Sequence, residues 1–219
     1  MVGNVIGFIG SDKYDLILYL SRILLHLGKK VLLVDYAESE ALYQCIPIPE
    51  ILREDNRFID YRGIDFIQGQ YYKSNMRQQY DAVLIDLGFN DENEIMLQCT
   101  KVLYVTDLQL HNVRRIKNLE NIKNINKYVV IKDVFQCKIK PEFILEELGQ
   151  GIDMDHVYIL YQDSLDLKYK IHSQYNHRFS FGKLSRPTKY FLKDIVKQMD
   201  HNLNEKRLNN AYRKAERGK

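Results

Sequence analysis

The sequence predicts an α/β fold, a doubly wound and mostly parallel sheet with helices on both faces. Short apolar runs alternate with segments of helical periodicity along the chain. The first 35 residues already form a strand–helix–strand unit, and the right-handed crossover of such units makes their two strands parallel. Because no repeat or Gly/Pro/Ser-rich linker divides the chain, we expect one domain over residues 1–199 and a basic C-terminal helical or frayed tail over residues 200–219.

The first strand–helix–strand unit has the clearest pattern. Residues 2–9 are an apolar run typical of a strand. An amphipathic helix follows, with its apolar stripe at Leu16, Leu20, Ile23, Leu24 and Leu27. Gly28 stands where a C-terminal helix cap belongs. The run 31–34 then predicts a buried strand that ends at Asp35.

The rest of the chain continues the alternation. A short strand pair is expected over 58–67, around Arg62-Gly63. Further strands are predicted at 82–85, 102–105, 128–131 and 157–160, and helices at about 91–99, 109–124 and 140–148. A last helix is expected after Ser185 or Thr188, either of which suits an N-cap, with Pro187 near its start.

The tail is basic. Residues 200–219 contain six Lys or Arg against three acids, and their sizeable apolar side chains are Leu203, Leu208 and Tyr212. That stripe is too thin for a strong interfacial membrane helix. A solvated terminal helix is the simplest interpretation, and contact with DNA or an acidic lipid surface is the alternative.

Composition excludes several classes of protein. The 219 residues are 45% hydrophobic and 28% charged, which excludes wholesale disorder. No apolar run approaches the ~20 residues of a membrane span, and the N-terminal residues lack the pattern of a signal peptide. Three widely spaced cysteines form neither a disulfide framework nor a zinc motif, so we expect a cytoplasmic protein.

Polar residues follow several predicted strands, where parallel α/β sheets bind their ligands. These positions are 10–15, Asp35, 86–88, 106–107 and 132–133. A glycine-containing loop before a helix can cradle phosphate groups. A lysine early in that helix can reach the phosphates, and an aspartate at a neighbouring strand end can hold Mg²⁺. The aspartates at 107 and 133 are more simply explained as turn residues.

Two other kinds of site fit less well. Gly7 and Gly10, with Asp35 after the second strand, match part of the dinucleotide fingerprint G-x-G-x-x-G, but Lys13 stands in the place of its third glycine. An NAD-type site is therefore disfavoured. His172 and His177 have no third ligand nearby in the sequence, so they do not predict a metal site.

Three segments together resemble one family. They read GFIGSDKYDLILYLSRILLHLGKKVLLVD, YDAVLIDLG and TKVLYVTD. In order and spacing they are similar to the ParA/MinD family of P-loop ATPases, which includes partition proteins, cell-division positioning proteins and pilus-assembly relatives of the CpaE/TadZ type. The resemblance covers roughly residues 2–170 and is strongest in the first 35. It implies a P-loop NTPase-like fold.

When the sequence is aligned with the family pattern, several residues of the family's nucleotide site are present. Lys13 falls on the phosphate-binding lysine and Gly10 on the second loop glycine. Asp35 matches the aspartate that ends the second strand, Asp86 matches the Walker B aspartate, and Gly88 lies in the turn after it. The resemblance thus implies a remnant nucleotide-binding site made of Gly10, Ser11, Lys13, Asp35, Asp86 and Gly88, with no catalytic residue assigned.

Five positions depart from the family pattern. The signature lysine, which crosses a dimer interface in the family, falls on Phe8, and the first loop glycine falls on Ile9. Asp12 replaces the glycine before the lysine and adds a charge that repels phosphate. Tyr14 replaces the Mg²⁺-binding hydroxyl residue, and Ala37 replaces the second acid of the D-x-D pair. Phosphoryl transfer depends on such positioning groups, so the resemblance implies a degenerate Walker A loop.

The expected function is therefore a non-hydrolysing localisation or scaffold component of a partition, pilus-assembly, secretion or conjugation system. ATP or ADP would bind weakly, with little place for Mg²⁺. By resemblance, the partners would be proteins, including a second copy of the chain or an intact homologue. Two alternatives stay open: an unusual but active ATPase using Lys13 and Asp86, and a DNA-associated partition protein using the tail and Arg114-Arg115.

Overall fold

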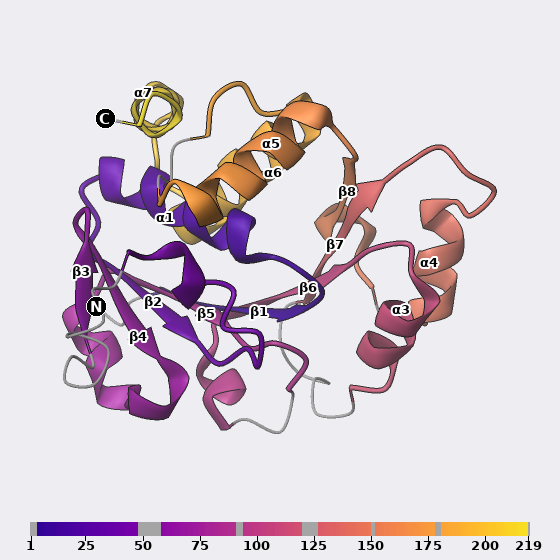
Figure 1. Ribbon diagram of the computed structural model, residues 1–219, viewed down its shortest axis with the longest axis horizontal. Coiled ribbons are helices and arrows are strands. Elements are labelled where there is room, and N and C mark those ends of the chain that lie inside the picture. The colour runs from indigo at the N-terminus through magenta and orange to yellow at the C-terminus, as the bar shows by residue number, and fades with distance from the viewer. Residues whose placement is uncertain are drawn as a thin grey trace.

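The computed structural model describes residues 4–47, 58–90, 94–119, 127–149, 152–177 and 181–218. Within these ranges one eight-stranded sheet has the order β3-β4-β2-β5-β1-β6-β7-β8 (Figure 1). Its strands are β1 (Asn4–Gly10), β2 (Val31–Asp35), β3 (Ile59–Tyr61), β4 (Ile64–Gln68), β5 (Ala82–Asp86), β6 (Lys101–Thr106), β7 (Lys127–Val134) and β8 (Val157–Tyr161). The β3–β4 pair is antiparallel and every other pair is parallel. The predicted fold class is thereby confirmed.

The helices cover both faces of the sheet (Figure 1). They are α1 (Tyr14–His26), α3 (Leu110–Lys117), α4 (Pro141–Leu148), α5 (Ser164–Tyr175), α6 (Arg186–Met199) and α7 (Glu205–Glu216). Side chains of α1, α6 and α7 share one apolar core with Phe8 of β1, while α3 and α4 share a second core with Val5 and Ile9. This division follows from the alternation of side chains along a strand.

The predicted strands are found within about three residues of their expected positions, and residues 2 and 3 of the first one lie outside the described ranges. The helix expected at 91–99 is instead a short 3-10 helix, Glu94–Gln98, and residues 91–93 lie outside the described ranges. The helix expected at 109–124 ends at Lys117, and its last predicted residues also lie outside them. Ser185 is the N-cap of α6, since its hydroxyl accepts the Thr188 N–H.

The end of β1 lies in the middle of the sheet, between β5 and β6. Gly10 has a φ of +121°, and a Cβ built on it would lie 2.0 Å from the carbonyl oxygen of Val105. Only glycine fits this close approach, because an L side chain would be strained and would collide with β6. The chain therefore turns sharply into the short loop 11–13 that leads to α1.

Residues 205–216 of the basic tail form the helix α7, which packs against α1. Leu208 and Ala215 are fully buried, and Tyr212 is 1% exposed. Of the two forms expected for the tail, helical or frayed, residues 205–216 take the helical one. Arg207 anchors the helix further by donating to the carbonyl oxygen of Leu27 at 2.8 Å.

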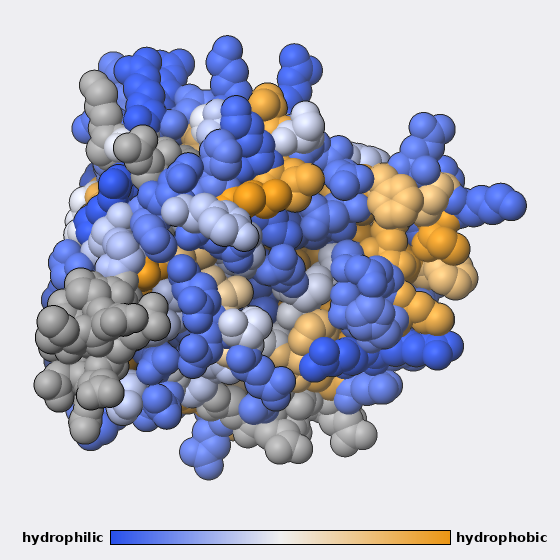
Figure 2. Space-filling model, viewed as in Figure 1, coloured by the Kyte–Doolittle hydropathy of each residue, from blue (hydrophilic) through white to orange (hydrophobic). Residues whose placement is uncertain are grey.

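Three exposed apolar side chains lie in α4 and in the segment just before it. Phe135, Ile139 and Phe143 are 54%, 41% and 49% exposed. Figure 2 shows orange side chains gathered at the end of the molecule where α3 and α4 lie, while most of the same face is blue. We call these three residues the α4 patch. Separately, none of the helices described is long and apolar enough to cross a bilayer.

Candidate functional site

A cavity of about 650 Å³ opens at the carboxyl ends of β1, β2 and β5. Its walls come from the loops that follow these strands, and Arg115 of α3 lies at its edge. Of the predicted site residues, the structure brings Gly10, Ser11, Lys13, Asp86 and Gly88 to this cavity. Asp35 ends β2 directly beside Asp86 in the sheet register, but does not line the cavity.

Lys13 and Asp86 form a buried ion pair at the cavity. The Nζ atom of Lys13 lies 2.7 Å from Oδ1 of Asp86, and the two side chains are 4% and 3% exposed. Nζ also donates to the carbonyl oxygen of Gly10 at 3.1 Å, while Oδ1 accepts the Gly88 N–H at 2.9 Å. The lysine charge is therefore compensated within the protein, and a phosphate would compete with Asp86 for it.

Asp35 closes the turn after β2. Its Oδ1 accepts the Ala37 N–H at 3.0 Å and its Oδ2 accepts the Tyr43 N–H at 2.9 Å. Burial, followed by the negative charge of Asp86, raises the pKa of the Asp35 carboxyl to about 6. Both carboxylate oxygens thus accept hydrogen bonds from backbone amides. In this conformation Asp35 therefore stabilises the loop that places Ala37 at the cavity wall.

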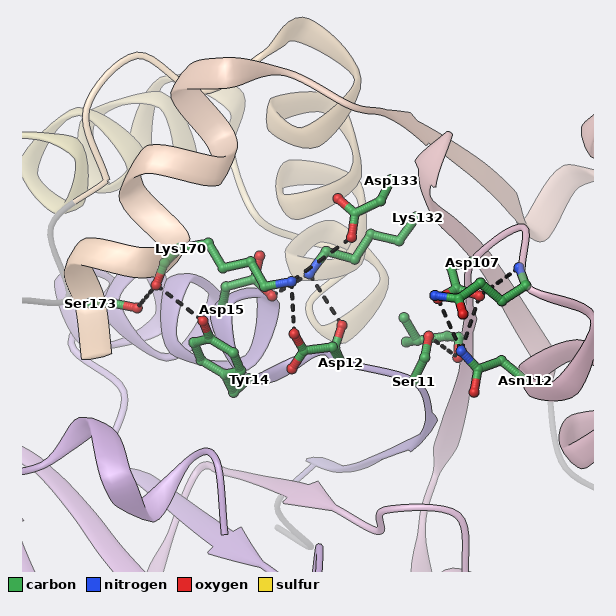
Figure 3. Close-up of polar contacts among 12 residues, drawn as sticks. Ser11, Asp12, Tyr14, Asp15, Asp107, Asn112, Lys132, Asp133, Lys170 and Ser173 are labelled. Carbon is green, nitrogen blue, oxygen red and sulfur yellow. Dashed lines mark hydrogen bonds and ion pairs between the residues drawn. The ribbon is translucent and has the colours of Figure 1, made fainter. Parts of the chain in front are cut away.

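Tyr14 turns away from the cavity. Its side chain is buried, and its hydroxyl donates to the carbonyl oxygen of Lys170 on α5 at 3.2 Å (Figure 3). Burial, with the nearby charge of Asp15, raises the pKa of the phenol far above its usual value. The residue aligned with the family's metal-binding hydroxyl thus faces α5. Phe8 and Ile9 are fully buried in the sheet cores.

The Asp12 carboxylate also points toward α5 (Figure 3). Its Oδ2 lies 2.8 Å from Nζ of Lys170. Lys132, at the end of β7, donates to the carbonyl oxygen of Asp12 at 3.2 Å and pairs with Asp15 at 2.5 Å. Sequence reasoning placed Lys132 at a strand end without assigning it a role, and it missed Lys170, because no local pattern connects residue 170 with residues 12–15.

The N-terminus of α1 meets the cavity at Lys13, whose side chain makes no capping hydrogen bond. The first amides of a helix point outward without intrahelical partners and carry partial positive charge. Such a terminus, next to a glycine-containing loop, suits an anion. Ser11 closes the loop on its other side, since its N–H and hydroxyl both donate to Val105, at 2.8 and 3.2 Å.

Asp107, which directly follows β6, has a structural role. Asp107 accepts hydrogen bonds from the Gln109 N–H at 2.8 Å and from the side chain of Asn112 at 3.0 and 3.1 Å (Figure 3). These bonds order the start of α3. The interpretation of Asp107 as a turn residue is thus supported.

Arg115 was expected only as a possible DNA contact. The structure places its guanidinium 3.7 Å from the ring centroid of Phe89, at the edge of the cavity. A guanidinium at this place can meet an anionic ligand without breaking a buried ion pair. Among the described residues, no group of three or more His, Cys, Asp or Glu is arranged to hold a metal ion.

No protein-family model and no curated protein sequence matches the chain. Several solved structures, however, match the chain. A ParA family ATPase from Chlorobium tepidum TLS matches with a TM-score of 0.54, 14% identity and 98% coverage of each chain. The chain has the ParA/MinD fold.

Two further matches support this assignment of the fold. A McdA–ATP complex from Cyanothece matches with a TM-score of 0.58 and 10% identity, over 93% of this chain and 98% of the other. The MinC:MinD cell division protein complex of Aquifex aeolicus matches with a TM-score of 0.55 and 17% identity, over 78% and 87%. The fold implied by the sequence resemblance is confirmed.

Proposed function

We propose that this protein is a ParA/MinD-like nucleotide-binding protein that does not hydrolyse ATP and acts as a localisation or scaffold component. The observation that carries the proposal is the orientation of Tyr14. Its phenol is buried against α5 and bonded to Lys170, so the position of the metal-binding hydroxyl offers no ligand to the cavity. A partition, pilus-assembly, secretion or conjugation system is the expected setting.

Nucleotide binding is supported by what remains of the site. The cavity is lined by Gly10, Ser11 and Lys13, the N-cap of α1, and a loop of this kind before a helix suits a phosphate group. Arg115 adds a cation at the edge. One structural neighbour, McdA, was solved with ATP. Because Lys13 is already paired with Asp86, binding would require the lysine to exchange one anionic partner for another, so we expect weak affinity.

Loss of hydrolysis is supported by several positions together. Mg²⁺ and the attacking water must be positioned for phosphoryl transfer. Ala37 offers no carboxylate at the cavity wall, and Tyr14 offers no hydroxyl there. Phe8, which aligns with the signature lysine, is an apolar side chain buried in the sheet. The lack of a carboxylate, a hydroxyl and an ammonium group at these three positions removes groups that would stabilise the charge of the transition state.

A protein partner is supported by the surface. The α4 patch exposes three large apolar side chains close together in the sequence, as contact surfaces often do. One structural neighbour contains MinD in complex with MinC. We therefore propose protein partners for this chain, with a homodimer or a pairing with an intact homologue as the arrangements to test.

Isothermal titration tests the proposal. Wild-type protein is titrated with ATP, ADP and a non-hydrolysable ATP analogue, with and without Mg²⁺, and steady-state ATPase activity is measured alongside. We expect binding in the range of about 10 µM to 1 mM, little effect of Mg²⁺ and no turnover above background. An ATPase rate in the usual range of enzymes, about 1 s⁻¹ or more, would overturn the non-hydrolysing assignment.

The matched variants are Lys13→Ala and Lys168→Ala. Lys13 lines the cavity, whereas Lys168 is an exposed lysine on α5. Lys13→Ala should abolish the heat of binding and Lys168→Ala should preserve it. Because Lys13→Ala alone leaves the Asp86 carboxylate buried without its partner, Lys13→Ala with Asp86→Asn serves as a second variant whose folding is checked by circular dichroism.

A second candidate function is DNA association through α7. Its basic residues Lys206, Arg213 and Lys214 are exposed, while its apolar side is buried against the core. Deleting residues 200–219 would expose that core, so the better test replaces these three residues by Gln. DNA binding that weakens with salt and is lost in the triple variant would support this function. The absence of salt-sensitive binding in the wild type would exclude it.

A further inference from the structure

Two lysines and three aspartates form a compact cluster on the α5 side of the β1–α1 loop (Figure 3). Lys170 of α5 lies 2.8 Å from Asp12 and 3.8 Å from Asp133, measured between Nζ and the carboxylate oxygens. Lys132 pairs with Asp15 and donates to the backbone of Asp12. The cluster therefore joins the loop after β1, the end of β7 and the middle of α5.

The central lysine of the cluster is more deeply buried than the aspartate it binds. The side chain of Lys170 is 12% exposed, whereas that of Asp12 is 55% exposed. The pKa of Lys170 is raised: burial of the ammonium opposes this, but the charges of Asp15 and Asp12 outweigh burial. Lys170 thus stays charged, and the Asp12 carboxylate is free to move whenever this contact opens.

Asp12 also lines the cavity, directly before Lys13. A carboxylate that rotated toward the cavity would lie beside a bound phosphate, and two negative charges at such distances repel strongly. In the structure the carboxylate is instead bound on the far side of the loop by Lys170 (Figure 3). The ion pair therefore removes the obstacle that Asp12 would otherwise present to an anion.

We infer that Lys170 is a positioning residue that makes the loop able to bind phosphate. It holds the Asp12 carboxylate off the cavity, so the affinity of the loop for a nucleotide phosphate depends on the position of α5. This inference rests on the proposed nucleotide binding. It adds a coupling between α5 and the loop that the retained family positions do not imply.

Affinity for ATP tests the inference in the full chain. Lys170→Met removes the ammonium, and Lys168→Met is the matched control on the exposed side of α5. Lys170→Met should weaken ATP binding by about tenfold or more, and Lys168→Met should not. Lys170→Arg keeps the charge and should bind as the wild type does. Adding Asp12→Asn to Lys170→Met should restore affinity, which a merely structural role of Lys170 would not allow.

Hydrogen exchange of the free protein provides a readout without nucleotide. The amides of residues 11–16 should exchange faster in Lys170→Met than in Lys168→Met, because the loop loses its contact with α5. Equal exchange in the two variants, or no rescue by Asp12→Asn, would overturn the inference. If the wild type binds no nucleotide but the exchange rates differ, the proposed function fails while the contact between Lys170 and the loop stands.

Discussion

The ammonium of Lys13 and the carboxylate of Asp86 lie 2.7 Å apart beneath the β1–α1 loop, both almost completely buried. They come from elements 73 positions apart in the chain, the N-cap of α1 and the last residue of β5. A buried pair of this kind costs desolvation on both sides, and its attraction offsets that cost only while both members are present.

The first prediction concerns this pair. Asp86→Ala should lower the free energy of unfolding by about 3 kcal/mol, because the Lys13 ammonium would be left buried without its partner. The double variant Lys13→Met with Asp86→Leu should lose much less stability than the single variants Lys13→Met and Asp86→Leu lose together, since no charge remains buried in it. Urea denaturation of the four proteins measures the coupling. Additive losses would contradict the interpretation.

The second prediction concerns pH. The pKa of Asp35 is raised from 3.8 to about 6, so the folded state binds this proton more tightly than the unfolded state. The stability contributed by Asp35 is therefore complete below about pH 4 and is lost as the pH rises through about 6, by roughly 3 kcal/mol at most. The side chain in Asp35→Asn cannot ionise. The stability of this variant relative to the wild type should therefore increase as the pH rises over this range.

The measurement for Asp35 is urea denaturation of wild type and Asp35→Asn at several pH values. The difference between the two proteins isolates Asp35 from the other carboxyl groups. An amide oxygen can replace only one of the two backbone contacts made to Ala37 and Tyr43, so a constant loss of stability in the variant is expected as well. A difference that does not change with pH would show that the Asp35 pKa is not raised.

The third prediction compares two glycines. Gly10→Ala should destabilise the protein by several kcal/mol, on the order of 3 or more, because its Cβ would lie 2.0 Å from the Val105 oxygen at a φ of +121°. Gly28 also has a positive φ, +80°, but nothing lies within 4 Å of its Cβ position. Gly28→Ala should therefore cost only about 1 kcal/mol. Thermal unfolding of both variants tests the contrast.

The fourth prediction concerns α7. Tyr212 is 1% exposed, and its ring lies 5.4 Å from that of Phe181, between centroids. Tyr212→Ala should lower the free energy of unfolding by about 3 to 4 kcal/mol through the cavity it leaves. Lys214→Ala, on the exposed side of the same helix, should change it by less than about 0.5 kcal/mol. Similar small effects would mean that α7 does not pack on α1 in solution.

Much of the fold could be predicted because it depends on local patterns. The strand–helix–strand unit, the hairpin around Arg62 and Gly63, and the strand ends at Asp35 and Asp86 follow from apolar periodicity and turn residues. Amphipathic periodicity also predicted a helix at 91–99, where the described part is a 3-10 helix, because local apolar spacing does not decide between the two.

Only part of the candidate site, likewise, could be predicted from the sequence. Gly10, Ser11, Lys13, Asp86 and Gly88 could be found because they follow strands, and strand ends meet at one edge of a parallel sheet. The roles of Asp12, Tyr14 and Lys170 could not, since each depends on a contact across more than 150 positions in the chain.

The sequence by itself therefore determined the α/β fold, the place of the candidate site at the strand ends and the residue types found there. Only the tertiary structure decided which way those side chains point and what they contact. It turns the Tyr14 phenol toward α5, binds the Asp12 carboxylate to Lys170 and neutralises Lys13 with Asp86. The physical reason is that strand and helix patterns are set by neighbours along the chain, whereas the direction of a charged side chain is set by the opposite charge that packing brings beside it.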